Sequence, residues 1–254
     1  MPNVTDISAQ LTELDAIRSW RDMYRAEMNC QVIHDSIHGR PGWTREYVLR
    51  RGSTDVGYGS VAVAGPWAGK PTVYEFYVIP PHRSHVFELF ETFLEASNAT
   101  AIEVQSNDPL VTVMLHSFAR EVSTEAILFH DRLTTWHAPP GAIFRQATAA
   151  EAPDTATEDL RWRGVVEVDG SVAATGGVLF HYNRPYGDIY MDVAEPFRRR
   201  GLGTFVVQEL KRVCYEGGHV PAARCGPGNV ASRLTLQRAG FVPCGHILCG
   251  RVPR

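Results

Sequence analysis

The sequence predicts an α+β protein built from two related halves. Short apolar runs typical of strands alternate with helical patterns along the whole chain. Residues 78–83 have the same Val-x-x-Pro-x-Arg spacing as residues 193–198, and each segment follows a strand-like run and precedes an apolar-periodic helix. A stretch that contains proline and glycine, residues 137–141, separates the two patterns. We therefore expect one half over residues 1–137 and a related one over residues 138–254.

The first half is expected to open with an amphipathic helix, because apolar side chains recur at three- and four-residue steps between Leu11 and Met28. A strand and an apolar-periodic helix should follow. Then come a second strand, a helix that begins at Asn107, and a final strand. These elements are expected at residues 72–78, 86–94, 101–104, 107–120 and 126–129.

In the second half, Asp169-Gly170 is a hairpin signal between two strands. The helix that begins at Leu202 has one apolar face and extends to about Tyr215. Strands are expected near residues 142–147, 165–168, 172–179, 188–194, 221–225 and 241–248, and a second helix over residues 229–238. Between residues 149 and 160 there is room for one short helix at most, since Pro153 limits helix formation.

The segment from Asp188 to Gly203 carries the strongest functional signal. It predicts a strand, a turn at Glu195-Pro196, and three arginines that lead into a helix start with two glycines. Free N–H groups and the positive end of the helix dipole favour phosphate there. A missing Cβ lets a ligand lie against the main chain. A diphosphate is the simplest ligand, and a plain helix start with surface arginines is the alternative.

Two other phosphate motifs are excluded. The chain has no Gly-x-x-x-x-Gly-Lys-Ser/Thr sequence, so a P-loop is not predicted. Val206 stands where the third glycine of the dinucleotide fingerprint would fall.

Val193 followed by Arg198-x-x-Gly201-x-Gly203 resembles the acetyl-CoA motif of the GNAT superfamily of acyl-CoA N-acyltransferases. The run from Asn229 to Gly240-Phe241 is similar to a second family element, an Asn-led helix that ends in Gly-Phe. The resemblance covers residues 165–249. It implies that each half is a mixed, mostly antiparallel sheet flanked by helices, and that acetyl-CoA is the co-substrate. Asn229 and Gly240 can also be explained as ordinary helix caps, whatever the function.

The resemblance also implies how the cofactor is held. A β-bulge near the end of the motif strand would splay it from the next strand, and the acyl group would sit in the gap. Backbone groups of Val193 would hold the thioester carbonyl, and N–H groups of residues 199–204 the diphosphate. The expected cofactor-binding residues are Val193, Arg198, Arg199, Arg200, Gly201, Leu202, Gly203, Thr204, Asn229 and Ser232.

The first half lacks these features. Aligned on the shared Pro and Arg, Val86 and Glu88 stand where Gly201 and Gly203 stand. A carboxylate is repelled by a diphosphate, so we expect that this half has lost cofactor binding. Family members usually place two helices in part of the acceptor wall, and the second half has little room for them. We expect the first half, or a second subunit, to supply that wall.

The resemblance implies direct attack of an amine on the thioester. A lysine-like amine with a pKa near 10.4 must lose a proton, at a cost of about 4.6 kcal/mol at pH 7. A general base would supply part of this. Asp188, Tyr190 and Asp192 share one face of the predicted strand. We predict Asp192 and Asp188 as candidate bases, although either can instead cap a turn or pair with an arginine.

The proton donor to the departing thiolate is less defined. Many family members use a tyrosine, and its place in this chain is taken by Leu236. Tyr190, Ser232 and His246 are alternatives, or the thiolate leaves unaided, since a thiol pKa near 8.5 makes a tolerable leaving group. A cofactor-binding sensor without turnover is therefore the competing interpretation.

Composition limits the partners. Net charge is −3, which argues against a general nucleic-acid binder, although the arginines at 198–200 are a local exception. The five cysteines and the histidines match no disulfide or zinc framework, so no metal is expected. No apolar run is long enough to span a membrane and the first residues are polar, so a cytoplasmic location is expected. We predict a small-molecule amine as acceptor, with a protein or peptide amine as the alternative, and a monomer or homodimer.

Overall fold

The computed structural model describes residues 6–31, 35–148, 150–151, 161–180 and 182–253. The chain divides into two compact units. Unit 1 comprises Met1–Glu125 and His246–Arg254, and unit 2 comprises Ala126–Gly245. The chain thus leaves unit 1 at residue 126, and its last nine residues return to it.

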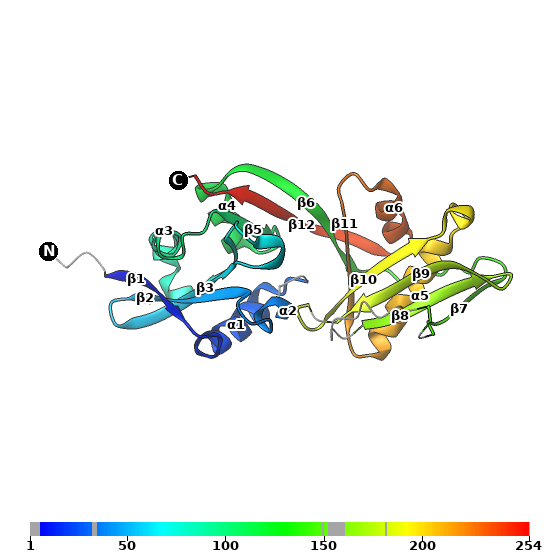
Figure 1. Cartoon of the computed structure of the whole chain (residues 1–254), viewed down its shortest axis with the longest axis horizontal. Coiled ribbons are helices and arrows are strands. Elements are labelled where there is room, and N and C mark those ends of the chain that lie inside the picture. The colour runs from blue at the N-terminus through cyan, green and yellow to red at the C-terminus, as the bar shows by residue number, and fades with distance from the viewer. Residues whose placement is uncertain (1–5, 32–34, 149, 152–160, 181, 254) are drawn as a thin grey trace. The chain divides into compact units, whose positions relative to one another are not determined.

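Unit 1 is a mixed sheet with helices against both faces (Figure 1). The strand order is β1-β2-β3-β4-β5-β12, and all pairs are antiparallel except β4–β5. Its elements are β1 (Ile7–Thr12), α1 (Leu14–Met28), α2 (Asp35–His38), β2 (Thr44–Arg51), β3 (Thr54–Ala62), η1 (Gly65–Trp67), β4 (Thr72–Val78), η2 (Pro80–His85), α3 (Val86–Ser97), β5 (Ala101–Gln105) and α4 (Pro109–Phe118).

Unit 2 repeats this plan. Its strand order is β7-β8-β9-β10-β11-β6, with β10–β11 the parallel pair. Its elements are β7 (Ala142–Gln146), β8 (Arg161–Val168), β9 (Ser171–Leu179), β10 (Tyr186–Val193), η3 (Glu195–Phe197), α5 (Leu202–Glu216), β11 (Val220–Cys225) and α6 (Val230–Arg238). The predicted α+β fold of two similar halves, each a mixed and mostly antiparallel sheet, is confirmed.

The two halves of the sequence exchange one long strand each, and these strands complete the two sheets. β6 (Arg120–Asp131) begins in unit 1, but its residues 127–130 pair with β11 of unit 2. β12 (Phe241–Arg251) begins in unit 2, and its residues 247–251 pair with β5 of unit 1. Each unit therefore takes its last strand from the other half of the sequence. The sequence pattern predicted both strands but not their partners, because alternation identifies a strand and not the edge that it joins.

The first predicted helix differs at its start. Residues 7–12, which include Leu11, form strand β1, and the helix begins at Leu14. A strand of six residues at the edge of a sheet leaves a weak sequence signal. Residues 149 and 152–160, where the sequence allowed one short helix, lie outside the described residues.

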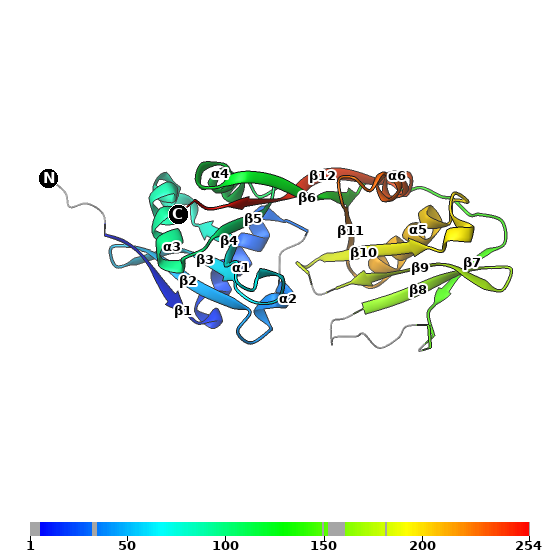
Figure 2. The same ribbon diagram turned by 45° about the horizontal axis from the view of Figure 1, so that its top comes forward.

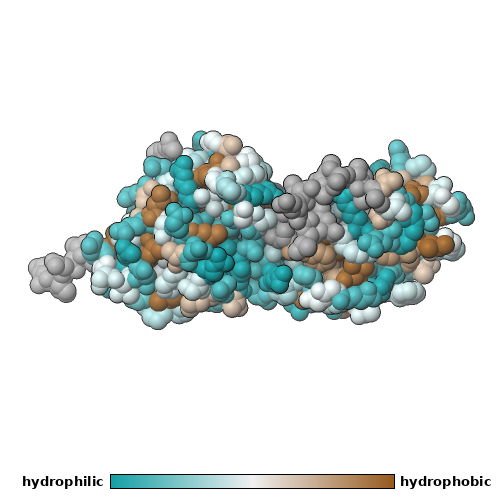
Figure 3. All heavy atoms as spheres, turned by 60° about the horizontal axis from the view of Figure 1, so that its bottom comes forward, coloured by the Kyte–Doolittle hydropathy of each residue, from teal (hydrophilic) through white to brown (hydrophobic). Residues whose placement is uncertain are grey.

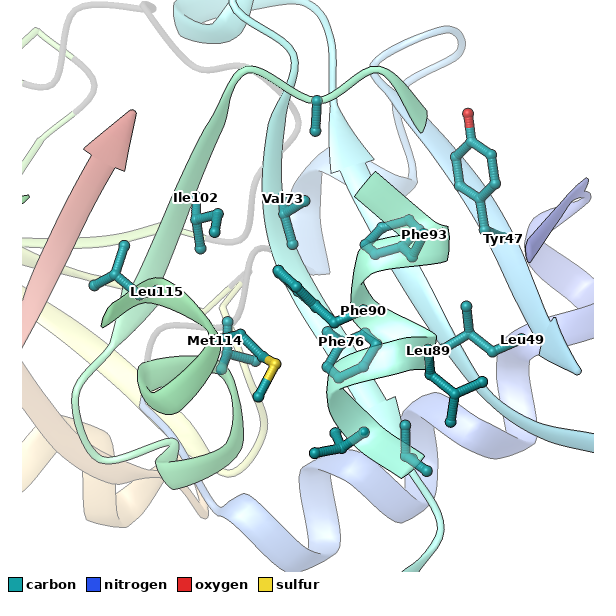
Figure 4. Packing of buried hydrophobic residues seen from close by; sticks show 14 of the residues in the cluster. Tyr47, Leu49, Val73, Phe76, Leu89, Phe90, Phe93, Ile102, Met114 and Leu115 are labelled. Carbon is teal, nitrogen blue, oxygen red and sulfur yellow. The ribbon is translucent and has the colours of Figure 1, made fainter. Parts of the chain in front are cut away.

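Apolar side chains alternate along β4 toward two layers. Phe76 and Val78 face α3, where the rings of Phe76 and Phe90 meet edge to face with centroids 4.7 Å apart (Figure 4). Tyr77 points to the opposite face, where it packs with Ile17 of α1. In unit 2, α5 covers β8, β9 and β10 with its apolar stripe (Figure 2). α3 in unit 1 and α5 in unit 2 therefore occupy equivalent places, each packed on the sheet of its own unit.

No helix in the described ranges is long and apolar enough to cross a membrane. On the face shown in Figure 3, hydrophilic and hydrophobic residues are interspersed.

A buried charge network lies under α1 in unit 1. Arg21 donates to both oxygens of Glu75, at 2.9 Å each, and Tyr58 donates a third hydrogen bond to the same carboxylate. His38 lies between Glu46, at 3.1 Å, and Glu75, at 3.4 Å. Burial alone would lower the pKa of His38, but the two carboxylates outweigh it and raise that pKa to about 8.

This network makes the stability of the protein depend on pH. The pKa of His38 is raised above its unfolded value near 6.5, so the stabilisation is complete below pH 6.5 and disappears as the pH rises through about 8. We expect the free energy of unfolding to fall by up to about 2 kcal/mol between pH 6.5 and 9. Urea unfolding at both pH values measures this. His38→Gln should remove the difference, and an unchanged difference in that variant would assign it to another group.

Candidate active site

The N-terminus of α5 has free hydrogen-bond donors. The first bond of the helical ladder runs from Phe205 N to Gly201 O, at 3.1 Å. The N–H groups of Leu202, Gly203 and Thr204 precede this ladder, and within the described residues none of them has an acceptor. No side chain caps this helix. Three donors and the positive end of the helix dipole are therefore available to an anion.

The N-terminus of α6 is closed in contrast. The side chain of Asn229 accepts a hydrogen bond from Ser232 N, at 3.0 Å. This is the plain cap that the sequence allowed for Asn229. Of the two helix starts singled out from sequence, only that of α5 remains open.

Three arginines precede the open helix start and differ in role. Arg198 Nε donates to the carbonyl of Val193, at 3.0 Å, just as Arg83 Nε donates to the carbonyl of Val78 in unit 1, at 2.8 Å. The shared Val-x-x-Pro-x-Arg spacing thus produces one local structure in both units. Arg199 and Arg200 are exposed and have no carboxylate partner among the residues described. Their charges lie within three residues of the free N–H groups.

The two glycines leave room for the protein's own side chains. A Cβ on Gly201, whose φ is +80°, would lie 2.0 Å from His137 Nε2. A Cβ on Gly203 would lie 3.1 Å from the Cγ2 atom of Thr235 on α6. The side chains of His137 and Thr235 therefore lie close to these two glycines, where the sequence predicts that a ligand can lie against the main chain. The free N–H groups are a separate feature and remain available.

The motif strand diverges from its neighbour. β10 pairs with β11 only through Tyr186–Ile189, and beyond this point β11 continues its pairing with β6 while β10 stays paired with β9. The pairing of β10 with β11 therefore ends at Ile189, in the part of the strand where an opening is predicted. The expected cause of that opening is not seen, because the register between β9 and β10 is regular along the paired residues, with no bulge. The strands separate through their different pairing partners.

The polar face of β10 is as predicted. Ile189, Met191 and Val193 pack against the core under α5, and Asp188, Tyr190 and Asp192 lie on the other face. Tyr190 and Asp192 are exposed. The Tyr190 hydroxyl lies over Gly177, where a Cβ would be 2.5 Å from it.

Asp188 is buried and only partly neutralised. Its Oδ2 atom lies 3.2 Å from Arg224 Nε, and its Oδ1 atom is buried with no hydrogen-bond partner among the described atoms. Burial raises the pKa of Asp188 to about 6, and the attraction of Arg224 offsets only part of that effect. The carboxylate is therefore paired with an arginine, as the sequence allowed, and is also a better proton acceptor than an exposed aspartate.

The candidate proton donors have separate local contacts. Leu236 is 2% exposed and part of the core of unit 2. The Ser232 hydroxyl hydrogen-bonds to the thiol of Cys225, whose pKa is raised, mainly by burial. His246 belongs to unit 1, where its backbone bonds to Ser106.

Sequence reasoning missed a segment that runs antiparallel along α5. Residues 131–137, here called the strap, are bound by a polar stripe of that helix. Gln208 accepts from His137 N at 3.0 Å and donates to Thr135 Oγ1 at 2.7 Å. Lys211 donates to Leu133 O at 2.9 Å, and Tyr215 donates to Asp131 at 2.8 Å. The sequence signal for this contact was the spacing of polar residues three and four apart on α5. The same spacing is equally typical of a solvent-exposed helix face.

The comparisons with known proteins agree with this geometry. A model of the Acetyltransferase (GNAT) family matches residues 127–241, which coincides with unit 2. The C-terminal half of the chain therefore matches the GNAT acetyltransferase family. Proteins of this family typically use acetyl-CoA and acetylate amines. The match leaves the acceptor unidentified.

Solved structures match the whole chain. A GNAT-family acetyltransferase from Colwellia psychrerythraea has a TM-score of 0.70 at 14% identity, over 97% of this chain and all of that one. A tandem GNAT protein from the clavulanic acid biosynthesis pathway has a TM-score of 0.61 at 14% identity, over 99% of both chains. A GCN5-related N-acetyltransferase from Sphaerobacter thermophilus has a TM-score of 0.55 at 15% identity. At such identities the likeness shows a shared tandem GNAT fold. No curated protein matches the sequence.

The strap depends on a buried ammonium group. Lys211 is 7% exposed, donates to the carbonyls of Leu133 and Ala239, and lies 2.7 Å from Asp131. Lys211→Met leaves Asp131 without its cation, so we expect the free energy of unfolding to fall by about 3 kcal/mol. Urea denaturation measures this.

The double variant Lys211→Met/Asp131→Asn tests the cause of that loss. Removing the unpaired carboxylate should recover part of the stability. If the double variant is less stable than Lys211→Met by the full cost of Asp131→Asn alone, the two groups are not coupled.

Proposed function

We propose that unit 2 transfers the acetyl group of acetyl-CoA to a primary amine of a small molecule, by direct attack of the amine on the thioester. One observation carries this proposal: the open N-terminus of α5, with two unpaired arginines beside it, follows a strand that separates from its neighbour. A diphosphate fits the first feature, and an acylated thiol arm fits the second. The family match to unit 2 supports the same reading.

Different residues of this chain would have different roles in binding the cofactor. The N–H groups of Leu202, Gly203 and Thr204 would bind the diphosphate, helped by the charges of Arg199 and Arg200. Arg198 would act indirectly, because it already fixes the carbonyl at the end of β10. Asn229 and Ser232 would support the site through the start of α6.

Asp188 is the better of the two candidate bases. With a pKa of about 6 it is mostly ionised at pH 7, yet it accepts a proton more readily than an aspartate at the usual value near 3.9. The difference lowers the cost of taking a proton from an amine by about 3 kcal/mol. Asp192 is exposed on the same face of β10.

Unit 1 is proposed to have lost cofactor binding. Glu88 lies in the first turn of α3, where its carboxylate is hydrogen-bonded to the His85 ring at 3.3 Å. A carboxylate already benefits from that helix N-terminus and would repel a diphosphate. The same fold therefore keeps its framework in unit 1 without its anion site.

A cofactor-binding protein without turnover is the second candidate. The observation in its favour is the burial of Leu236 at the place of the family's proton donor. Both candidates predict binding of acetyl-CoA. Only the enzyme predicts that free CoA thiol appears when an amine is added. A thiol-release assay over a panel of small amines and peptides therefore separates them.

Charge reversal tests the anion site without disturbing the core. In the double variant Arg199→Glu/Arg200→Glu, two repulsive charges replace two attractive ones, so we expect the affinity for CoA to fall at least tenfold at low salt. Isothermal titration calorimetry measures it. Arg212→Glu, about 15 Å further along α5, is the control and should bind normally. Equal affinities in the natural protein, the double variant and the control would show that CoA does not bind at the proposed site.

Amide substitutions test the base. Asp188→Asn should lower kcat/KM by about 100-fold or more and leave CoA affinity unchanged. In the natural protein, kcat/KM should rise with pH through a midpoint near 6, because the base must be deprotonated, and Asp188→Asn should abolish that step. Asp192→Asn, on the same strand face, is the matched control. Loss of turnover in Asp192→Asn alone would assign the base to Asp192.

A further inference from the structure

The strap places one exposed side chain at the open end of α5. The imidazole of His137 approaches Gly201 so closely that a Cβ there would lie 2.0 Å from Nε2. His137 is exposed to solvent, and within the described ranges its ring has no hydrogen-bond partner. A free donor thus lies beside the residue that precedes the three free N–H groups.

This position is held by α5 itself. Gln208, on the second turn of the helix, accepts from the backbone N–H of His137 and donates to Thr135 two residues earlier. Lys211, one turn later, bonds to the carbonyl of Leu133. Gln208 and Lys211 are both largely buried. Because one helix orients both its own N–H groups and the strap, the backbone of His137 keeps its place relative to those groups.

We propose that His137 belongs to the cofactor site, where an imidazole N–H donates to an oxygen of the diphosphate of CoA. Gly201 has no side chain to cap the helix, and its lack of a Cβ is what admits the ring. The strap therefore supplies the polar side chain that the helix start lacks. This inference rests on the proposed function, since it adds a residue to the same anion site.

Binding measurements test the proposal directly. We expect His137→Ala to bind CoA about tenfold more weakly, equivalent to about 1.4 kcal/mol, because one hydrogen bond to a charged group is lost. His137→Gln keeps an N–H donor and should recover part of the affinity. Trp136→Ala changes the neighbouring side chain, which is 79% exposed, and should bind normally. Calorimetric titration of each purified full-length protein gives these affinities.

Dephospho-CoA identifies the phosphate concerned. It keeps the diphosphate and lacks the ribose phosphate, so His137→Ala should weaken its binding by the same factor. A loss seen with CoA and absent with dephospho-CoA would overturn the assignment to the diphosphate. With acetyl-CoA, the variant should raise KM and keep kcat at saturation, which a general loss of folding would not do.

Two results would overturn the proposal and spare the proposed function. Unchanged affinity in His137→Ala would mean that the ring makes no contact with the ligand. Tighter binding in that variant would mean that the ring obstructs the site. If the natural protein shows no saturable binding of CoA, the proposed function itself fails, which is a distinguishable outcome.

Discussion

An α-helix cannot satisfy its own first N–H groups, and the proposed function depends on that constraint at α5. A side chain can solve the problem, as Asn229 does for α6 and Asp108 for α4, whereas α1, α3 and α5 have no side-chain cap. The residue before α5 is a glycine, which has no side chain to offer. The donors therefore remain available to a ligand with oxygens to share, and the exposed arginines beside them make an anion the favoured one.

The same helix organises the rest of unit 2. Its apolar stripe, which includes Val206 and Leu210, is fully buried against the sheet and fixes its distance from β10. Its polar stripe binds the strap through Gln208 and Lys211. Both stripes run along one rigid rod, so core packing, strap and helix start are coupled. A substitution in the buried stripe should therefore affect the N-terminus of α5, although the buried stripe itself does not contact a ligand.

Unit 1 has a similar fold but lacks the two glycines of the proposed anion site. From β2 onward its strands and α-helices follow the order found in unit 2 from β8 onward, and Arg83 repeats the hydrogen bond of Arg198. Yet its helix α3 starts with a glutamate in the first turn, and its strand β4 buries Glu75 against Arg21. Glu75 accepts hydrogen bonds from Arg21 and Tyr58, so this carboxylate stabilises the packing of α1 on the sheet of unit 1. The two units thus use similar folds to hold different polar groups.

The sequence by itself determined the local structure of the site. The Val-x-x-Pro-x-Arg spacing, the apolar period of α5 and the alternation of β10 each depend on neighbouring residues, so a linear pattern contains them. The resemblance to the GNAT motif then indicated acetyl-CoA as the expected ligand. The prediction that the first half has lost cofactor binding is local in the same way, because it depends on Val86 and Glu88 alone.

Only the tertiary structure decided what distant residues do. It exchanged β6 and β12 between the units, because a strand's pattern does not name the edge that it joins. It paired Asp188 with Arg224 and raised its pKa through burial, which no alternation of residues reveals. It also brought His137 to Gly201 across 64 positions of sequence, since the approach depends on hydrogen bonds from Gln208 that exist only once α5 is folded against the sheet. Contacts of this kind are set by three-dimensional packing, and the order of residues alone does not specify them.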